Sequence, residues 1–502
     1  MNTEFSNKRD RLRRTKIIAT LGPATDDRKV LEGVIAAGAD VFRLNMSHAV
    51  GEEQMVRARM VREVSASLGR EVALLADLQG PKIRVERFEN GLVQLANGDE
   101  FTLDAGDPST PGNSKRVGVS YAGLADDVKA DDLLLLDDGM ISMRVKSVKG
   151  GRIICEVENG GTLTDRKGLN LHGGGLSISG IAEHDLPHFK LAADMGVDYL
   201  AVSFPSNASD MHRARKLLRE AGSKAALMAK IERNEAITNL EEICDASDAV
   251  LVARGDLGVE IGDEELPGLQ KRIIRTALKH NRIVATATQM MQSMIENPIP
   301  TRAEVLDVAN AVLDGSDAVM LSAETAVGRH PVKVIEAMNR ICLGAERHFD
   351  REEEFVKSEV RFERIDEAIA MAAMFMATHV SIKAIIALTE SGSTAQWLSR
   401  VQSSVPIYAL SPNSASRRRM ALFRNVYPAH HRPCGDDIDE VIEDALQVLW
   451  RMGAVVEGDR VLLTSGDRLN NQGGTNTLRL IGIDHEGGFD HKTELDLNQS
   501  RI

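Results

Sequence analysis

The chain has 502 residues, 43% of them hydrophobic, and a formal net charge of −13 at pH 7. This length predicts about three domains with sizeable cores, and the acidity disfavours nucleic acid and anionic membrane surfaces as partners. The sequence lacks an apolar run of about 20 residues that could span a bilayer, and its basic first residues lack the apolar segment of a secretory signal. We therefore expect a cytoplasmic protein that binds neither nucleic acid nor a membrane.

Eight short apolar runs, separated mostly by amphipathic helical patterns, dominate the sequence. Uninterrupted apolar runs are typical of strands buried on both faces of a parallel sheet. Eight of them alternating with helices predict an α/β fold of the (β/α)8 TIM-barrel type, which we assign to residues 1–78 and 181–348. The runs occupy residues 16–22, 40–45, 72–78, 199–204, 225–232, 249–256, 283–289 and 318–325.

Two further domains are predicted from changes in this pattern. The stretch between the third and fourth runs alternates apolar and polar residues and turns often on Gly and Asp-Gly, so it predicts a small β domain inserted at residues 79–180. Alternating helical and strand patterns predict a C-terminal α/β domain at residues 349–482. Residues 483–502 are polar and are expected to form a tail.

The carboxyl ends of the predicted strands carry a concentrated set of charged residues. The active site of a (β/α)8 barrel lies at these ends. Glu232 and Asp256, from different strands, could hold one Mg²⁺ ion, which takes one or two protein carboxylates plus substrate oxygens and water. Lys230 and Arg43 match a phosphorylated, acidic substrate, so the set favours phosphoryl transfer. Any one of these residues alone is equally well an ordinary polar residue of a loop.

Five motifs resemble those of the pyruvate kinase family: TKIIATLGPA (15–24), FRLNMSH (42–48), ALMAKIERNEAI (226–237), VARGDLGVEIG (252–262) and TATQMMQSM (286–294). The resemblance implies a (β/α)8 barrel, an inserted small β-barrel that closes as a lid, and a C-terminal α/β regulatory domain. It implies transfer of the phosphoryl group of phosphoenolpyruvate to ADP, which gives pyruvate and ATP in the last step of glycolysis. The alternatives are another phosphoenolpyruvate-handling barrel enzyme and a catalytically silent sugar-phosphate sensor.

The resemblance also implies roles for individual residues at matching motif positions. Mg²⁺ or Mn²⁺ is expected at Glu232 and Asp256. His184 stands where many family members carry a lysine that helps to bind the nucleotide, which puts that contact in doubt. The expected residues are Lys230, Arg43, Thr288 and Arg84 for catalysis, Lys230, Gly255, Asp256, Thr288 and Ser203 for the substrate, and Asn45, His48 and Arg84 for the nucleotide.

A lysine in the motif GPKIR (80–84) bears on the need for K⁺. Many pyruvate kinases bind K⁺, for which the matching ligands here are Asn45, Ser47, Asp77 and the carbonyl of Leu78. Where those enzymes have glutamate, this chain has Lys82, which resembles the K⁺-independent branch of the family. A fixed ammonium can supply the charge of K⁺, since two unit charges about 4 Å apart interact by about 4 kcal/mol at an effective dielectric constant near 20. The alternative is a solvated turn lysine.

The loop LTESGST (388–394) precedes a predicted helix, so its hydroxyls and N–H groups could bind a phosphate or form an ordinary helix cap. In the family this loop binds sugar-phosphate effectors, and Glu390 stands where forms that bind fructose 1,6-bisphosphate often have lysine. We therefore expect a monophosphate activator such as glucose 6-phosphate, ribose 5-phosphate or AMP. Residues 416–424 could add cations to this site, but we expect them to form a solvated helix face. The resemblance implies a homotetramer. The expected effector residues are Thr389, Ser391, Gly392, Ser393 and Thr394.

Overall fold

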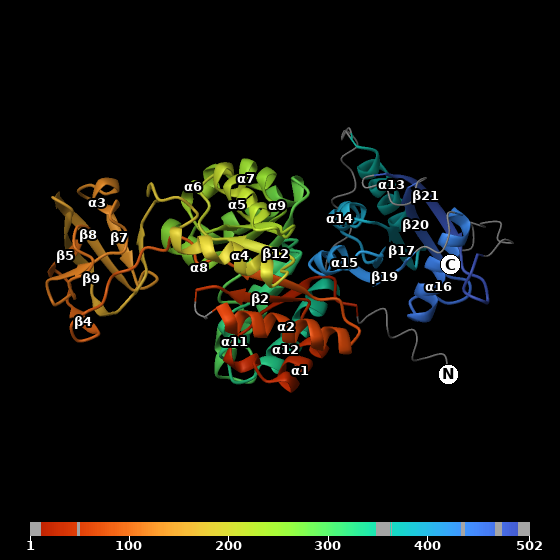
Figure 1. Cartoon of the computed structure of the whole chain (residues 1–502), viewed down its shortest axis with the longest axis horizontal. Coiled ribbons are helices and arrows are strands. Elements are labelled where there is room, and N and C mark those ends of the chain that lie inside the picture. The colour runs from red at the N-terminus through yellow and green to blue at the C-terminus, as the bar shows by residue number, and fades with distance from the viewer. Residues whose placement is uncertain are drawn as a thin grey trace.

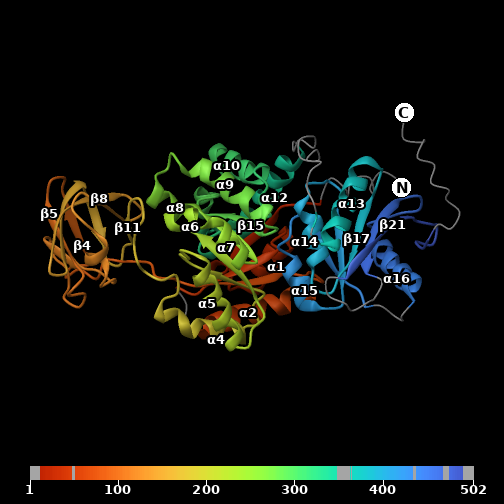
Figure 2. The same cartoon turned by 90° about the horizontal axis from the view of Figure 1, so that it is seen from above.

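The structure is a computed structural model that describes residues 12–47, 51–347, 362, 364–432, 437–466 and 474–489. A central barrel lies between a β domain that projects from one side and an α/β domain on the opposite side (Figure 1). The view from above keeps the same order (Figure 2). The barrel therefore separates the inserted domain from the C-terminal domain.

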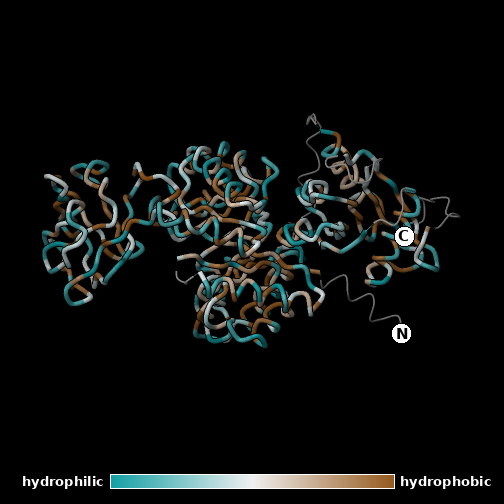
Figure 3. Tube along the Cα trace, viewed as in Figure 1, coloured by the Kyte–Doolittle hydropathy of each residue, from teal (hydrophilic) through white to brown (hydrophobic). Residues whose placement is uncertain are grey.

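The barrel is a closed parallel sheet with the strand order β1-β16-β15-β14-β13-β12-β3-β2. Every residue of β1, β3, β14 and β15 is buried, as expected for strands that are covered by helices outside and filled by side chains inside. Hydrophobic residues accordingly run through the middle of the barrel (Figure 3). The predicted (β/α)8 fold is confirmed. Its strands are β1 (Lys16–Thr20), β2 (Val41–Asn45), β3 (Ala73–Asp77), β12 (Tyr199–Val202), β13 (Ala226–Ile231), β14 (Ala249–Ala253), β15 (Ile283–Ala287) and β16 (Ala318–Leu321).

The helices of the barrel begin and end at local signals in the sequence. Thr301 and Glu304 form a capping box at the start of α10, and Gly38, at φ 117°, ends α1 in a left-handed conformation that favours glycine. The helices are α1 (Arg28–Ala37), α2 (Gly51–Ser67), α4 (Leu186–Asp194), α5 (Ala208–Glu220), α6 (Asn234–Thr238), α7 (Leu240–Ala246), α8 (Arg254–Ile261), α9 (Leu266–Lys279), α10 (Arg302–Leu313), α11 (Ala323–Ala326) and α12 (Pro331–Arg347).

The inserted domain has a two-stranded sheet, β10-β4, and a six-stranded sheet, β11-β7-β8-β9-β5-β6. Strands such as β4 alternate buried and exposed residues, because one face of the sheet packs on the core and the other faces solvent. Its elements are β4 (Leu92–Leu95), β5 (Glu100–Asp104), β6 (Arg116–Gly118), α3 (Leu124–Asp127), β7 (Leu133–Leu136), β8 (Ile141–Lys149), β9 (Arg152–Asn159), β10 (Gly161–Thr164) and β11 (Leu169–Leu171).

The C-terminal domain is built on a sheet of order β19-β18-β17-β20-β21, in which only the β20–β21 pair is antiparallel among the described strands. The sequence patterns did not reveal β19, because it is a short edge strand that contains Pro428. The elements are α13 (Ile365–His379), β17 (Ala384–Leu388), α14 (Ser393–Arg400), β18 (Ile407–Ser411), α15 (Ser414–Met420), β19 (Val426–His430), α16 (Ile438–Arg451), β20 (Arg460–Gly466) and β21 (Thr475–Gly482).

Helix α15 faces the barrel. Arg417 Nε lies 2.6 Å from Glu71 Oε1, and Arg418 Nε lies 2.9 Å from Asp198 Oδ1. The prediction of a solvated helix face for residues 416–424 was therefore wrong, because the acidic partners come from a part of the chain that is distant in sequence. Among the described helices, none has the length and apolarity needed to cross a membrane.

Candidate active site

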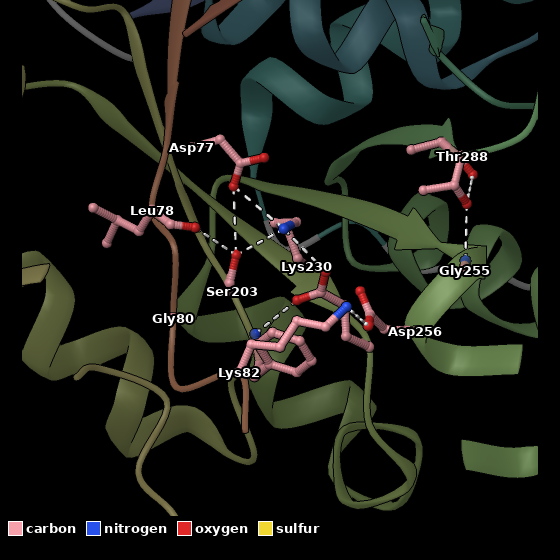
Figure 4. A network of polar contacts seen from close by, with 12 residues as sticks. Asp77, Leu78, Gly80, Lys82, Ser203, Lys230, Gly255, Asp256 and Thr288 are labelled. Carbon is pink, nitrogen blue, oxygen red and sulfur yellow. Dashed lines mark hydrogen bonds and ion pairs between the residues drawn. The ribbon is translucent and has the colours of Figure 1, made fainter. Parts of the chain in front are cut away.

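Lys230 lies at the centre of a polar cluster at the carboxyl ends of the barrel strands (Figure 4). Its Nζ is 2.7 Å from Ser203 Oγ, 2.9 Å from Glu232 Oε1 and 3.3 Å from Asp77 Oδ1. Burial alone would lower the pKa of Lys230, but Asp77 and Glu232 outweigh it and raise that pKa. Lys230 is therefore held as a buried cation between residues from three strand ends.

Asp77, the last residue of β3, is shared by two cations. Arg43 Nε donates to Asp77 Oδ2 over 2.6 Å, while Lys230 faces the other carboxylate oxygen. Burial opposes ionisation of Asp77, yet Lys230 and Arg43 lower its pKa. One carboxylate thus fixes both cations that the sequence assigned to a phosphoryl group.

Glu232 and Asp256 form the carboxylate pair that the sequence predicted for a divalent cation. Glu232 is 2% exposed, and its Oε2 accepts from the backbone N–H of Phe204 over 2.9 Å. Burial raises the pKa of Glu232, and the charge of Asp256 raises it further although Lys230 opposes this. A divalent cation would relieve this excess of negative charge, and carboxylate oxygens suit Mg²⁺. Within the described residues, no three His, Cys, Asp or Glu side chains are grouped to hold a metal.

Thr288 and the first turn of α8 face each other across the ends of β14 and β15. The N–H of Gly255 donates to Thr288 Oγ1 over 2.9 Å. Thr288 and Gln289 have φ values of 68° and 54°, a strained conformation that concentrates at functional sites. Gly255 and Asp256 lie in the first turn of α8, whose N–H groups have no acceptor within the helix, so this turn favours an anion.

Lys82 lies in the neck, the two segments 79–85 and 167–180 that join the inserted domain to the barrel. Its Nζ is 2.7 Å from Asp256 Oδ1 and 3.8 Å from Asp138 Oδ1 of the inserted domain. Burial alone would lower the pKa of Lys82, but Asp256 and Asp138 raise it. A Cβ added at Gly168 would lie 2.8 Å from Lys82 Cε. The side chain is therefore confined beside the carboxylate pair and is not a solvated turn lysine.

The residues expected to hold K⁺ lie together at the ends of β2 and β3. Asn45 pairs with Asp77 in the sheet register, and Asn45 Oδ1 accepts from the N–H of Ser47 over 3.1 Å. The carbonyl of Leu78 accepts from Ser203 Oγ over 2.7 Å. His48, expected at the nucleotide, lies outside the described residues.

Arg84, which was expected at the nucleotide, and His184, which replaces the lysine of many family members, both have contacts near the inserted domain. Arg84 lies in the neck, and its Nη1 donates to the carbonyl of Arg166 in the inserted domain over 2.9 Å. His184 Nε2 lies 3.2 Å from the carbonyl of Gly80, which is also in the neck. Both side chains thus contact the neck or the inserted domain.

The predicted effector loop connects β17 to α14. The N–H of Gly392 donates to Thr389 Oγ1 over 3.0 Å, and Arg419 of α15 donates to the carbonyl of Ser391 over 3.0 Å. Thr394 Oγ1 lies 2.6 Å from Thr475 Oγ1, and Thr394 is buried, so its hydroxyl faces the domain core. Thr389, Ser391 and Gly392 lie before α14, and Ser393 is its first residue.

Sequence reasoning missed Asp138 and Asp185. Asp138 was part of an Asp-Asp-Gly turn pattern, which indicates a turn and not a partner for Lys82. Asp185 accepts from the N–H groups of Gln79 and Gly80 over 3.1 Å each. No local signal distinguished it from other acids at a helix start.

A closed parallel barrel with a buried lysine, an arginine and a carboxylate pair at its mouth defines a (β/α)8-barrel enzyme that handles an anionic, phosphorylated substrate. The family models described as pyruvate kinase, barrel domain, and pyruvate kinase, alpha/beta domain, match residues 12–335 and 367–481. The chain belongs to the pyruvate kinase family. It is a phosphotransferase of glycolysis that acts on phosphoenolpyruvate and ADP and forms pyruvate.

Named relatives agree over nearly the whole chain. Pyruvate kinase II of Salmonella typhimurium is 50% identical over 478 residues, which covers 94% of this chain and 99% of the relative. The pyruvate kinase of Buchnera aphidicola subsp. Acyrthosiphon pisum is 48% identical over 478 residues, with the same coverage of both chains. The pyruvate kinase of Thermotoga maritima is 39% identical over 475 residues, which covers 94% of this chain and 100% of the relative.

Proposed function

We propose that this chain transfers the phosphoryl group at the Lys230 cluster, with Mg²⁺ or Mn²⁺ held by Glu232 and Asp256. The observation that carries this proposal is the convergence of Glu232 and Asp77 within 3.3 Å of the Lys230 ammonium group. Phosphoryl transfer needs positioning and charge stabilisation more than a protein nucleophile. This cluster of fixed charges supplies both.

Each side chain of the cluster has a separate part in the proposed reaction. Lys230 and Arg43 hold the phosphoryl oxygens and neutralise charge during transfer, because Asp77 pairs with both cations and fixes their positions. Thr288 and the N–H groups of Gly255 and Asp256 hold the substrate carboxylate, and Thr288 orients the proton donor for the enolate. A bound divalent cation supplies Lewis-acid polarisation of the phosphoryl oxygens. Ser203 orients Lys230 through the 2.7 Å hydrogen bond.

Removal of the divalent cation tests this proposal directly. We expect EDTA-treated protein to form no pyruvate from phosphoenolpyruvate and ADP, and we expect added Mg²⁺ or Mn²⁺ to restore the rate. The assay couples pyruvate to lactate dehydrogenase and separately measures ATP. Full activity after exhaustive chelation would contradict the metal role, and absence of turnover at saturating Mg²⁺ would favour a catalytically silent sugar-phosphate sensor.

The inserted domain is proposed to close over the barrel mouth and exclude water, so that the phosphoryl group reaches ADP instead of water. The Lys82–Asp138 distance of 3.8 Å supports such closure, because an acid of the inserted domain already lies beside the carboxylate pair. Asn45, His48 and Arg84 are proposed to contact the nucleotide phosphates. We further propose a homotetramer in the cytoplasm, where glycolysis takes place.

A monophosphate is proposed to activate the enzyme at residues 389–394. The turn offers hydroxyls and the N-terminus of α14, while Glu390 would repel a second phosphate. We expect glucose 6-phosphate, ribose 5-phosphate or AMP to lower the KM for phosphoenolpyruvate by about fivefold or more. The double variant S391A/S393A should keep the basal rate and lose this response. Stronger activation by fructose 1,6-bisphosphate would contradict the proposal.

A further inference from the structure

The inserted domain meets the barrel through the neck, whose two segments pair with each other. The N–H of Val85 donates to the carbonyl of Lys167, and the N–H of Leu169 donates to the carbonyl of Ile83, each over 2.9 Å. After β11 the chain passes through Gly173, Gly174 and Gly175, which all have positive φ values, a conformation in which glycine is favoured. The neck is thus a paired segment followed by a glycine turn.

Helix α8 is fastened to this neck at both ends. At its first turn, Asp256 Oδ1 lies 2.7 Å from Lys82 Nζ. At its last turn, the carbonyl of Glu260 accepts from the N–H of Gly173 over 2.8 Å, and the Asn170 side chain hydrogen-bonds to the Glu260 carboxylate. A short helix is a rigid element, so a displacement at one end moves the other. The proposed mechanism uses the first attachment and leaves the second unexplained.

Glu260 is a buried acid that joins three elements. It is 3% exposed, and its Oε2 accepts from the N–H of Asn234, the first residue of α6, over 3.0 Å. Asn234 Nδ2 in turn donates to the carbonyl of Gly173 over 2.8 Å. Asn170 is 6% exposed, so neither side chain of the Asn170–Glu260 pair is open to solvent. A buried carboxylate is costly, and this one is retained where the glycine turn meets α8.

We propose that Glu260 is a positioning residue that ties the neck to α8, so that movement of the inserted domain and placement of Asp256 and Gly255 are coupled. This inference rests on the proposed closure of the inserted domain. When the tie is intact, the neck holds the last turn of α8 while Lys82 holds the first. When the tie is loosened, the inserted domain can move without placing Gly255 and Asp256 in the first turn of α8. Phosphoryl transfer then slows.

The ionisation of Glu260 gives the proposal a pH signature. Burial raises the pKa of Glu260 to about 7, although the Asn234 N–H, Arg233 and Asn170 oppose this and Glu235 adds to it. The ionised carboxylate is the stronger acceptor for Asn170 and Asn234, so the tie tightens as the pH rises through about 7. The native protein holds this proton more strongly than the unfolded chain, in which the pKa of Glu260 has its ordinary value of 4.5. The contribution of Glu260 to stability is therefore lost as the pH rises from 4.5 to about 7.

The test compares E260Q, N170A and the wild-type enzyme from pH 6 to 8.5, with E264Q as the control. Glu264 is exposed and lies four residues after Glu260, so E264Q removes the same charge without touching the neck. We expect E260Q at pH 8 to have a higher Tm than wild type but a kcat lower on the order of tenfold. The inflection of wild-type kcat near pH 7 should disappear in E260Q.

N170A keeps the acid and removes one hydrogen bond to its ionised form, so the inflection should move to higher pH. This variant also keeps the test open if E260Q does not fold. Loss of activity and stability together in E260Q, or an unmoved inflection in N170A, would overturn the coupling. K230M would still lack activity in that case, so failure of the tie is distinguishable from failure of the proposed active site.

Discussion

K230M should lower kcat for pyruvate formation by about a thousandfold or more, because it removes a fixed positive charge from the transferring phosphoryl group. Methionine has a similar length and no charge, so the change isolates the ammonium. Glu232 would lose its 2.9 Å partner and become protonated more readily, since its pKa is already raised by burial. The rate should be measured at saturating Mg²⁺ and phosphoenolpyruvate.

Stability must be measured beside the rate, because breaking a buried ion pair can cost about 3–5 kcal/mol. K216M serves as the matched control, since Lys216 is an exposed lysine of α5 that pairs with Glu220 over 3.8 Å. We expect K216M to keep its kcat and K230M to fold with a reduced Tm. A folded K230M with more than about a tenth of the wild-type kcat would show that Lys230 does not carry the transfer.

The second large effect concerns Lys82. Wild-type enzyme should work at nearly full rate in buffers free of K⁺ and NH4⁺, because the ammonium beside Asp256 supplies a fixed charge. K82E should lose activity on the order of a hundredfold in such buffers and recover with added K⁺, since it exchanges that charge for a carboxylate near Asp256. The measurement is kcat as a function of K⁺ concentration, at constant ionic strength kept with a tetramethylammonium salt.

Two further variants sharpen this experiment. K115E makes the same charge change at an exposed residue of the inserted domain and should show no need for K⁺. In G168A the added Cβ would lie 2.8 Å from Lys82 Cε, so it should displace the ammonium without removing it. We expect G168A to respond to K⁺ more weakly than K82E does. A strong K⁺ requirement of the wild-type enzyme would refute the proposal that Lys82 replaces K⁺. The absence of a K⁺ requirement in K82E would refute it as well.

The barrel was predictable because the signals for its strands and helices lie in neighbouring residues. Each of the eight strands is a short apolar run, and the period of the helices between them appears directly in the sequence. Strand β19 was missed because it is short and contains Pro428. The contacts of α15 with the barrel were missed because its partners Glu71 and Asp198 are remote in sequence. A pattern of arginines cannot show which acids will face it.

By itself, the sequence determined the barrel, the inserted β domain, the C-terminal α/β domain and the family, through apolar periodicity and five motifs. It also placed Lys230, Glu232 and Asp256 at the carboxyl ends of strands, which lie together at one face of a (β/α)8 barrel. Only the tertiary structure decided which charges touch: Lys82 with Asp256, Asp138 beside Lys82, and Glu260 at the neck. The physical reason is that the apolar pattern of a strand or helix depends on neighbouring residues. An ion pair depends on the distance between segments that only the folded chain brings together.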